Sequence, residues 1–211
     1  ATSLDISGDI DVDGTSNLDV VDIDGAVDMA STLQVDGAIT GSSTINGVGI
    51  SSNITNFSQG ILISNDAGTG TLDGASNNTG LGFEVFDDLT SGDQNTGVGV
   101  QALAKVTTGS NNNAFGETAL FTNTTGGNNV AMGRAALETN NADNNTAIGH
   151  QALKANSTGA TNVAVGSSAL LANTTASENV AVGNSALAAN TTGTDNTAVG
   201  FAALDANTTA N

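Results

Sequence analysis

The feature that most constrains this chain is a 17-residue phrase that recurs eight times between residues 78 and 211. A typical copy begins Asn162-Val-Ala-Val-Gly166-Ser-Ser-Ala-Leu170. The fifth position is always glycine, and these glycines are 17 residues apart except for one step of 16, between Gly133 and Gly149. A short period repeated this often is typical of a solenoid, in which each copy forms one coil and buries its apolar face only by stacking on its neighbours. We therefore expect an extended, repetitive fold.

Comparison of the eight copies with one another indicates which positions the coil needs inside. Positions four and nine are apolar in every copy, and position eight is alanine in all copies but one. We predict that these three positions fill the interior of the coil. Position six varies from aromatic to charged, which predicts an outward-facing site. The residues at position four are Leu81, Val98, Phe115, Met132, Ile148, Val165, Val182 and Val199.

Two further positions indicate how the coils are joined. Position one is asparagine in all eight copies, and equivalent asparagine side chains in stacked coils can bond one another as a ladder. Glycine at position five, and glycine or alanine at position three, indicate close backbone approach or a positive φ. We predict both the ladder and the close approach.

The secondary structure of one coil is open between two alternatives. The Asn-x-Ala-Val-Gly part has strand and turn character, whereas residues 151–156 have a helix-forming composition. We favour coils made of strands, and a coil of one strand and one short helical turn is the alternative.

Residues 1–50 have a different rhythm, in which aliphatic and acidic residues alternate, as in Ile10-Asp-Val12-Asp-Gly14. This alternation predicts short, half-buried strands ended by turns. Strands this short bury too little apolar surface to fold alone, so we expect them to intertwine with identical chains. The chain is thus expected to have an Asp/Gly-rich fibre region (1–50), a junction (51–77) whose Phe57 and Ile61–Ile63 plug the end of the coil stack, and a solenoid (78–211).

Charge and composition exclude several kinds of partner. The formal net charge is −18, which excludes nucleic acid. No apolar run approaches the length that spans a membrane, so we expect no membrane insertion. Cysteine, proline, tryptophan and tyrosine are absent and only six residues are aromatic, which favours a thin core of small aliphatic side chains.

The sequence offers little catalytic chemistry. With no cysteine and one histidine, it contains neither a catalytic triad nor a zinc site, so we expect no enzyme, no cofactor and no catalytic or metal-binding residue. Asp9, Asp11 and Asp13 resemble the start of a calcium loop, but the position of its final glutamate is Val20. A solvated acidic face is favoured there, and calcium binding stays open. The Asn-x-Ser/Thr sequons recur at one coil position, which favours turn chemistry over glycosylation.

Three stretches carry a resemblance to known proteins. The phrase Asn-x-Ala-Val/Ile-Gly-x-x-Ala resembles the head repeat of trimeric autotransporter adhesins. The longer phrase Ala-Leu-x-x-Asn-Thr-Thr-Gly-x-x-Asn-Thr-Ala-Val-Gly resembles repeats of phage tail-fibre proteins, and residues 18–40 are similar to segments of marine phage structural proteins. The resemblance implies an all-β homotrimer of left-handed parallel β-rolls. The 17-residue copy is longer than the usual adhesin repeat, and the chain stops inside its eighth copy, so we expect a fragment or a processed form.

The function that the resemblance implies is that of a virion fibre, such as a phage tail fibre, that mediates or supports attachment to the host cell surface. Its partners would be two identical chains, other tail or capsid proteins and a host receptor such as a glycan. The alternative is a subunit of an extracellular filament or trimeric adhesin on a bacterial surface.

Overall fold

The computed structural model describes residues 44–45, 48–54, 57–64 and 73–211, and it describes side chains for Leu62 and from Asp73 onward. All regular elements in these residues are β-strands. The first four are β1 (Thr44–Ile45), β2 (Val48–Ile54), β3 (Phe57–Ser64) and β4 (Ala75–Ser76). One three-residue strand then follows in each repeat copy: β5 (Thr79–Leu81), β6 (Thr96–Val98), β7 (Asn113–Phe115), β8 (Val130–Met132), β9 (Thr146–Ile148), β10 (Val163–Val165), β11 (Val180–Val182) and β12 (Thr197–Val199).

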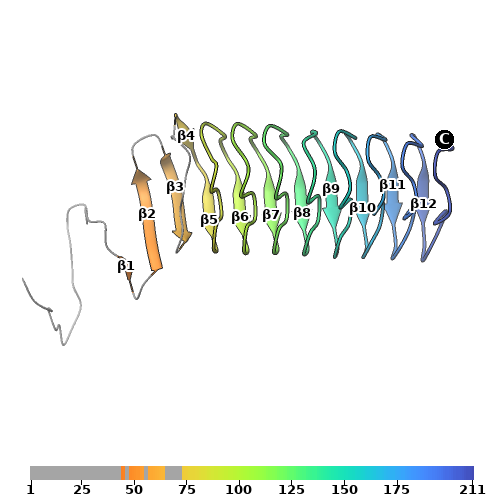
Figure 1. Cartoon of the computed structure of the whole chain (residues 1–211), viewed down its shortest axis with the longest axis horizontal. Coiled ribbons are helices and arrows are strands. Elements are labelled where there is room, and N and C mark those ends of the chain that lie inside the picture. The colour runs from red at the N-terminus through yellow and green to blue at the C-terminus, as the bar shows by residue number, and fades with distance from the viewer. Residues whose placement is uncertain (1–43, 46–47, 55–56, 65–72) are drawn as a thin grey trace, which may run out of the picture. The chain divides into compact units, whose positions relative to one another are not determined.

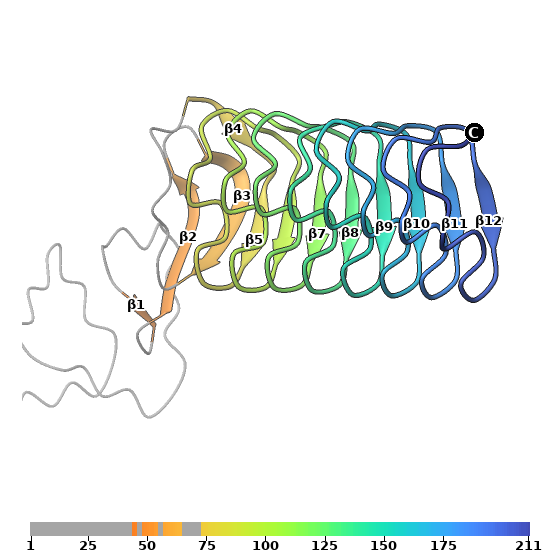
Figure 2. The ribbon, with the colours of Figure 1, turned by 45° about the vertical axis from the view of Figure 1, so that its right-hand side comes forward.

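The solenoid is built by parallel pairing of equivalent positions in successive copies (Figures 1 and 2). Val163 pairs with Val180 and Val165 with Val182, and the same register runs from β5 to β12. The 16-residue copy keeps this register, because Val130 still pairs with Thr146. Its missing residue is therefore absorbed in the loop. At the other end, β3 pairs in parallel with β5 but antiparallel with β2, so the sheet changes direction there.

The alternative of a helical turn in each coil is wrong for the described residues, which contain no helix and hence none long and apolar enough to cross a membrane. The reason lies at positions seven and nine, which have positive φ in every copy. In the fifth copy, φ is 57° at Gln151 and 51° at Leu153. Left-handed residues cannot continue a right-handed helix, so this segment forms consecutive turns instead.

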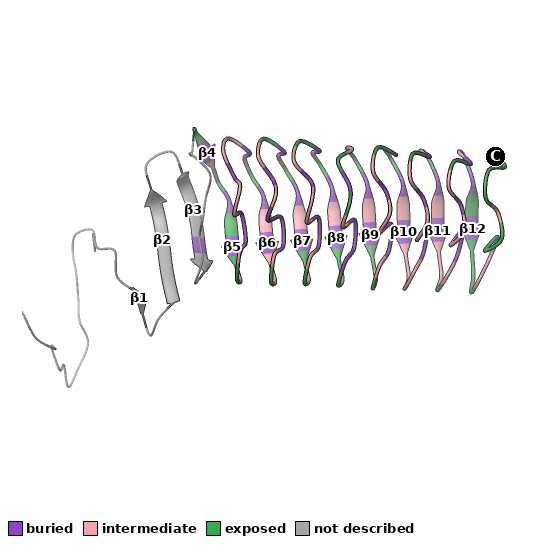
Figure 3. Ribbon diagram, in the orientation of Figure 1, coloured by how far each residue is buried: buried purple, intermediate pink, exposed green. Residues whose placement is uncertain are grey.

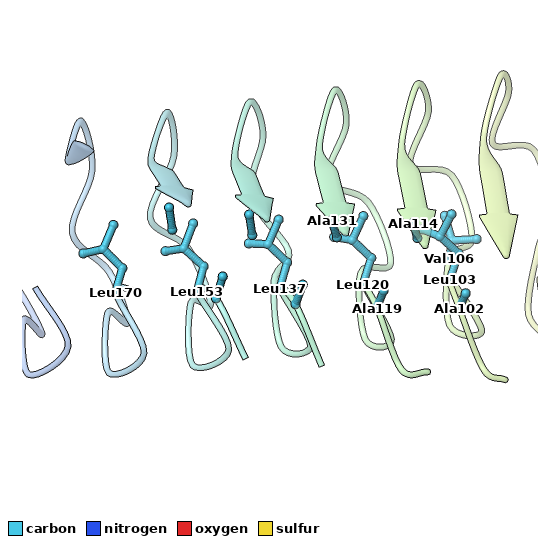
Figure 4. Packing of buried hydrophobic residues seen from close by; sticks show 14 of the residues in the cluster. Ala102, Leu103, Val106, Ala114, Ala119, Leu120, Ala131, Leu137, Leu153 and Leu170 are labelled. Carbon is cyan, nitrogen blue, oxygen red and sulfur yellow. The ribbon is translucent and has the colours of Figure 1, made fainter. Parts of the chain in front are cut away.

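The core is a thin column of small side chains. Positions eight and nine are buried as predicted, apart from the last copy, and the leucines at position nine stack from coil to coil (Figure 4). The prediction that position four is also inside is wrong. Position three is inside instead, and Ala114, Ala131, Ala147 and Ala164 are fully buried. Successive residues of a strand point to opposite faces, so burial of position three places positions two and four outside.

Bulky residues close the N-terminal end of this column. Of the predicted end plug, only the Leu62 side chain on β3 is described, and it is buried; the side chains of Phe57, Ile61 and Ile63 lie outside the described ones. Phe86 takes the place of leucine at position nine of the first copy. Gly80 lies against both, because a Cβ there would come within 2.7 Å of Leu62 Cδ1 and 3.0 Å of the Phe86 ring. The larger side chains thus explain why position three is glycine in the first copy and alanine from the third copy onward.

The predicted asparagine ladder at position one is confirmed. The Asn162 side-chain Oδ1 accepts the backbone N–H of Asn179 at 3.0 Å, and its Nδ2 donates to Ala176 O at 2.8 Å across the same coil. A second ladder runs along position twelve, where Asn173 Nδ2 donates to Asn156 Oδ1 at 2.9 Å and also to Ala176 O at 3.0 Å. The two ladders satisfy the polar groups of a buried turn, which would otherwise weaken the coil.

The glycine at position five is required by both conformation and space. Its φ lies between 130° and 143° in all eight copies, a region that other residues rarely adopt. At Gly166 a Cβ would also lie 2.4 Å from Gly183 O of the next coil. The close approach predicted from the sequence is therefore confirmed.

Candidate interaction surface

The residues at positions two and four of β5 to β12 form what we call the outer sheet face. Because the strands pair in register, each position forms a straight column along the solenoid, with a repeat of about 4.8 Å per coil. Position four is apolar throughout, and Leu81 and Met132 are 49% and 43% exposed. Figure 3 colours much of each strand as intermediate or exposed. The column is apolar without interruption, and its side chains are exposed or half-buried. A contiguous apolar surface of this kind typically marks an interaction site.

The outer sheet face is also uncharged. None of its positions carries an acidic or basic residue in any copy, although the chain has a formal charge of −18. Position two holds threonine or valine, with one exception at Asn113. Charged residues of the solenoid lie instead at positions outside the strands, for example at positions six, ten and seventeen. The chain therefore leaves one face free of the charge that makes its other surfaces repel a like-charged neighbour.

The basic residues are all engaged within the chain. Each of them pairs with an acid one coil earlier: Lys105 with Asp87 and Asp88 at 3.2 Å, Arg134 with Glu117 at 3.3 Å, and Lys154 with Glu138 at 3.3 Å. The hydrogen bond that Lys105 donates to Asp88, followed by the one it donates to Asp87, raises the pKa of Lys105 above its usual value. These ion pairs are exposed and contribute little stability. Because they engage all the basic residues, the charged side chains left without an oppositely charged partner on the described surface are acidic.

Several residues that the sequence singled out are not part of this surface. Asp9, Asp11 and Asp13 lie outside the described residues, and residues 73–211 hold no cluster of three or more His, Cys, Asp or Glu side chains suited to a metal. His150 is exposed at position six, as expected for an outward site. The sequon residues Asn156, Asn173 and Asn190 are buried with their amides in the position-twelve ladder, which supports the structural interpretation of these sequons.

The sequence alone does not reveal the outer sheet face, because apolar character at position four fits burial in the chain's own core as well as burial against a partner. A signal for the correct assignment was present. Alternation along a strand places positions one and three on the same side, and the invariant asparagine and small residue there fit a narrow interior better than Phe115 or Met132 does. No family model, curated protein or solved structure matches the chain, so the face is interpreted from its own residues.

Proposed function

We propose that the chain is the shaft of a homotrimeric attachment fibre, in which copies associate along the outer sheet face. The observation that carries this proposal is the uncharged apolar column at position four on a chain of charge −18. Copies with this charge repel one another everywhere except along such a face. A second copy also has the same coil spacing, so its column meets this one at every coil along a strip of about 34 Å.

The setting that best fits such a fibre is a virion, as a phage tail fibre that supports attachment to the host cell surface. The resemblance of the longer repeat phrase to tail-fibre repeats supports this setting. The partners would be tail or capsid proteins at one end and a host receptor, such as a glycan, at the other. The alternative is a bacterial surface adhesin or extracellular filament, which the resemblance of Asn-x-Ala-Val/Ile-Gly-x-x-Ala to adhesin heads supports.

The proposed mechanism is mechanical and multivalent. Backbone pairing at every coil and two side-chain amide ladders make the solenoid stiff along its axis. A stiff trimeric shaft holds three weak receptor contacts close together, so their combined avidity exceeds the affinity of any one contact.

The first test is the molar mass of the purified chain by light scattering, with Val165→Asp and Ser167→Asp as a matched pair. Both variants add one negative charge, but Val165 is on the outer sheet face, whereas position six, occupied by Ser167, already carries Glu117 in another copy. We expect three times 20.6 kDa for the wild type and for Ser167→Asp. Val165→Asp should be monomeric, with an unchanged circular dichroism spectrum. A monomeric wild type, or a trimeric Val165→Asp, contradicts the proposed assembly.

Repeating the measurement with a calcium chelator tests the N-terminal aspartates separately. Loss of the trimer on chelation would assign Asp9, Asp11 and Asp13 a metal-binding role, and no change would leave them as a solvated face. The biological setting is tested by immunogold electron microscopy with an antibody against residues 78–211. Label on phage tails supports the virion fibre, label on uninfected bacterial surfaces supports the adhesin, and absence of label from both overturns the attachment function.

A further inference from the structure

Asn113 is the one amide on the outer sheet face. It occupies position two of β7, next to Phe115 on the same side of the strand, and it is half-buried. The equivalent positions in the neighbouring coils are Thr96 on one side and Val130 on the other. Within the part of the chain that the structure describes, the Asn113 side chain makes no hydrogen bond, whereas its backbone takes part in the sheet, with its N–H bonded to Asn129 O at 2.8 Å.

This unpaired amide at position two differs from the asparagine side chains at position one. The position-one asparagines are buried, and all of them except Asn196 in the last copy bond to the next coil. The Asn113 amide points away from the chain's own ladder, among side chains that are otherwise apolar or hydroxyl-bearing. Burial of this face without a partner for the amide would cost free energy, because an amide taken out of water must replace its hydrogen bonds.

An assembly of repeat coils has a register problem that such a residue solves. Position four is apolar in every copy, so sliding one chain past another by one coil, about 4.8 Å, still places apolar side chains opposite each other. The displaced pair of chains loses the contact of only one coil per chain. A single polar residue in an otherwise apolar interface removes this degeneracy, as a buried asparagine does in coiled coils.

We infer that Asn113 sets the axial register in which copies of this chain associate along the outer sheet face. The inference rests on the proposed homotrimer. In register, three Asn113 amides meet at one level, and each donates one hydrogen bond to the next and accepts one from the previous chain. A slip of one chain by one coil, in either direction, places one amide of the displaced pair opposite Val130, which offers no side-chain hydrogen bond, and the other opposite Thr96. The ring of amides is then lost.

The absence of native cysteine makes register directly measurable by disulfide formation. Two single-cysteine chains, Thr146→Cys and Val163→Cys, carry the cysteine at position two of adjacent coils. The two chains are co-expressed and oxidised, and a mass tag on one of them distinguishes disulfides between like chains from disulfides between unlike chains. Same-coil disulfides report the in-register assembly, and cross-coil disulfides report a one-coil slip, because disulfides form only within a narrow Cα separation. We expect same-coil products to exceed cross-coil products by about tenfold or more in the wild-type background.

Three variants in this background test the role of Asn113. Asn113→Val introduces the residue already present at position two of β8, β10 and β11, so the coil should fold and assemble, while the product ratio falls to within about twofold. Thr79→Val removes a hydroxyl from the same column and should leave the ratio unchanged. The double variant Asn113→Val, Val130→Asn moves the amide by one coil and should restore the ratio.

The outcomes separate this inference from the proposed assembly. A trimer of Asn113→Val that keeps the wild-type ratio overturns the role of Asn113 and leaves the homotrimer standing, with the different sizes of the position-four residues as the source of register. Mixed registers in the wild type also overturn it. A wild-type chain that stays monomeric overturns the homotrimer and this inference together.

Discussion

Alanine substitution at position five gives a sharp test of the stacking geometry, because two equivalent glycines differ in one respect. Gly166 has φ 137° and its Cβ would lie 2.4 Å from Gly183 O of the next coil. Gly200 has φ 130°, but it lies in the last copy, where the nearest atom to its Cβ would be Ala203 Cβ at 4.0 Å. Gly166→Ala therefore combines backbone strain with a steric conflict, whereas Gly200→Ala carries the backbone strain alone.

The magnitudes follow from these two terms. Alanine in this φ region costs about 1–3 kcal/mol at either position. At Gly166 the next coil must also move away, which costs about 1–3 kcal/mol for overpacking. That movement weakens the bonds from Gly183 N to Val165 O at 2.7 Å and from Ser185 N to Ser167 O at 2.9 Å, each contributing about 0.5–1.5 kcal/mol. Gly166→Ala should thus be more destabilising than Gly200→Ala by about 2–6 kcal/mol.

Native-state hydrogen exchange, read coil by coil, is the appropriate assay, because solenoids can unfold locally and a single transition need not report one copy. For Gly166→Ala we expect protection to fall on both sides of the substitution, in β10 and β11. For Gly200→Ala we expect the loss to stay in β12 and its flanking turns. Equal losses of protection around the two sites would refute the steric argument and leave the backbone conformation as the whole reason for glycine.

Three further predictions concern the side-chain network. Asn173→Val, in the middle of the position-twelve ladder, removes the bonds of Asn173 to Asn156 Oδ1 (2.9 Å) and from Asn190 Nδ2 (3.0 Å). Asn123→Val, at the end of the ladder next to Val106, removes a single ladder bond, the long one from Asn140 Nδ2 (3.4 Å). Each variant also loses the bond to a carbonyl of its own coil, so urea unfolding should show a larger loss for Asn173→Val, by about 1–2 kcal/mol. Asn141 Oδ1 accepts the N–H groups of Thr124 (3.1 Å) and Thr125 (2.9 Å) in the 16-residue copy, so Asn141→Ala should speed exchange of these two amides while Asn141→Asp should not. The pKa of Lys105 is raised in the fold, so its ion pairs stabilise the fold fully below the unfolded-state pKa of about 10.4, and this stabilisation is lost as the pH rises through the folded-state pKa. The small difference in urea midpoint between wild type and Lys105→Met should therefore disappear in strongly alkaline solution. A difference that stays constant with pH would contradict the ion-pair explanation.

The 16-residue copy shows how far pattern alone can be taken. The glycine spacing places the missing residue between Gly133 and Gly149, and the structure places it in the loop between β8 and β9, because these strands pair without a shift. The replacement of threonine by Asn141 at position thirteen had no evident reason in the sequence. In the structure its side-chain oxygen takes the place of a backbone carbonyl, since the equivalent N–H groups of Thr107, Thr108 and Gly109 all donate to Thr124 O.

The sequence by itself determined the period, the stacking of equivalent positions, the burial of positions eight and nine and the requirement for asparagine and glycine. These properties are local to one coil and are repeated eight times, so comparison of the copies reveals them. The tertiary structure decided which apolar column is core and which is surface. A coil this narrow accommodates only alanine or glycine opposite the leucine at position nine, so Leu81, Phe115, Met132 and their equivalents lie outside. Hydrophobicity measures the tendency to leave water, and it does not distinguish burial within the chain from burial against a partner.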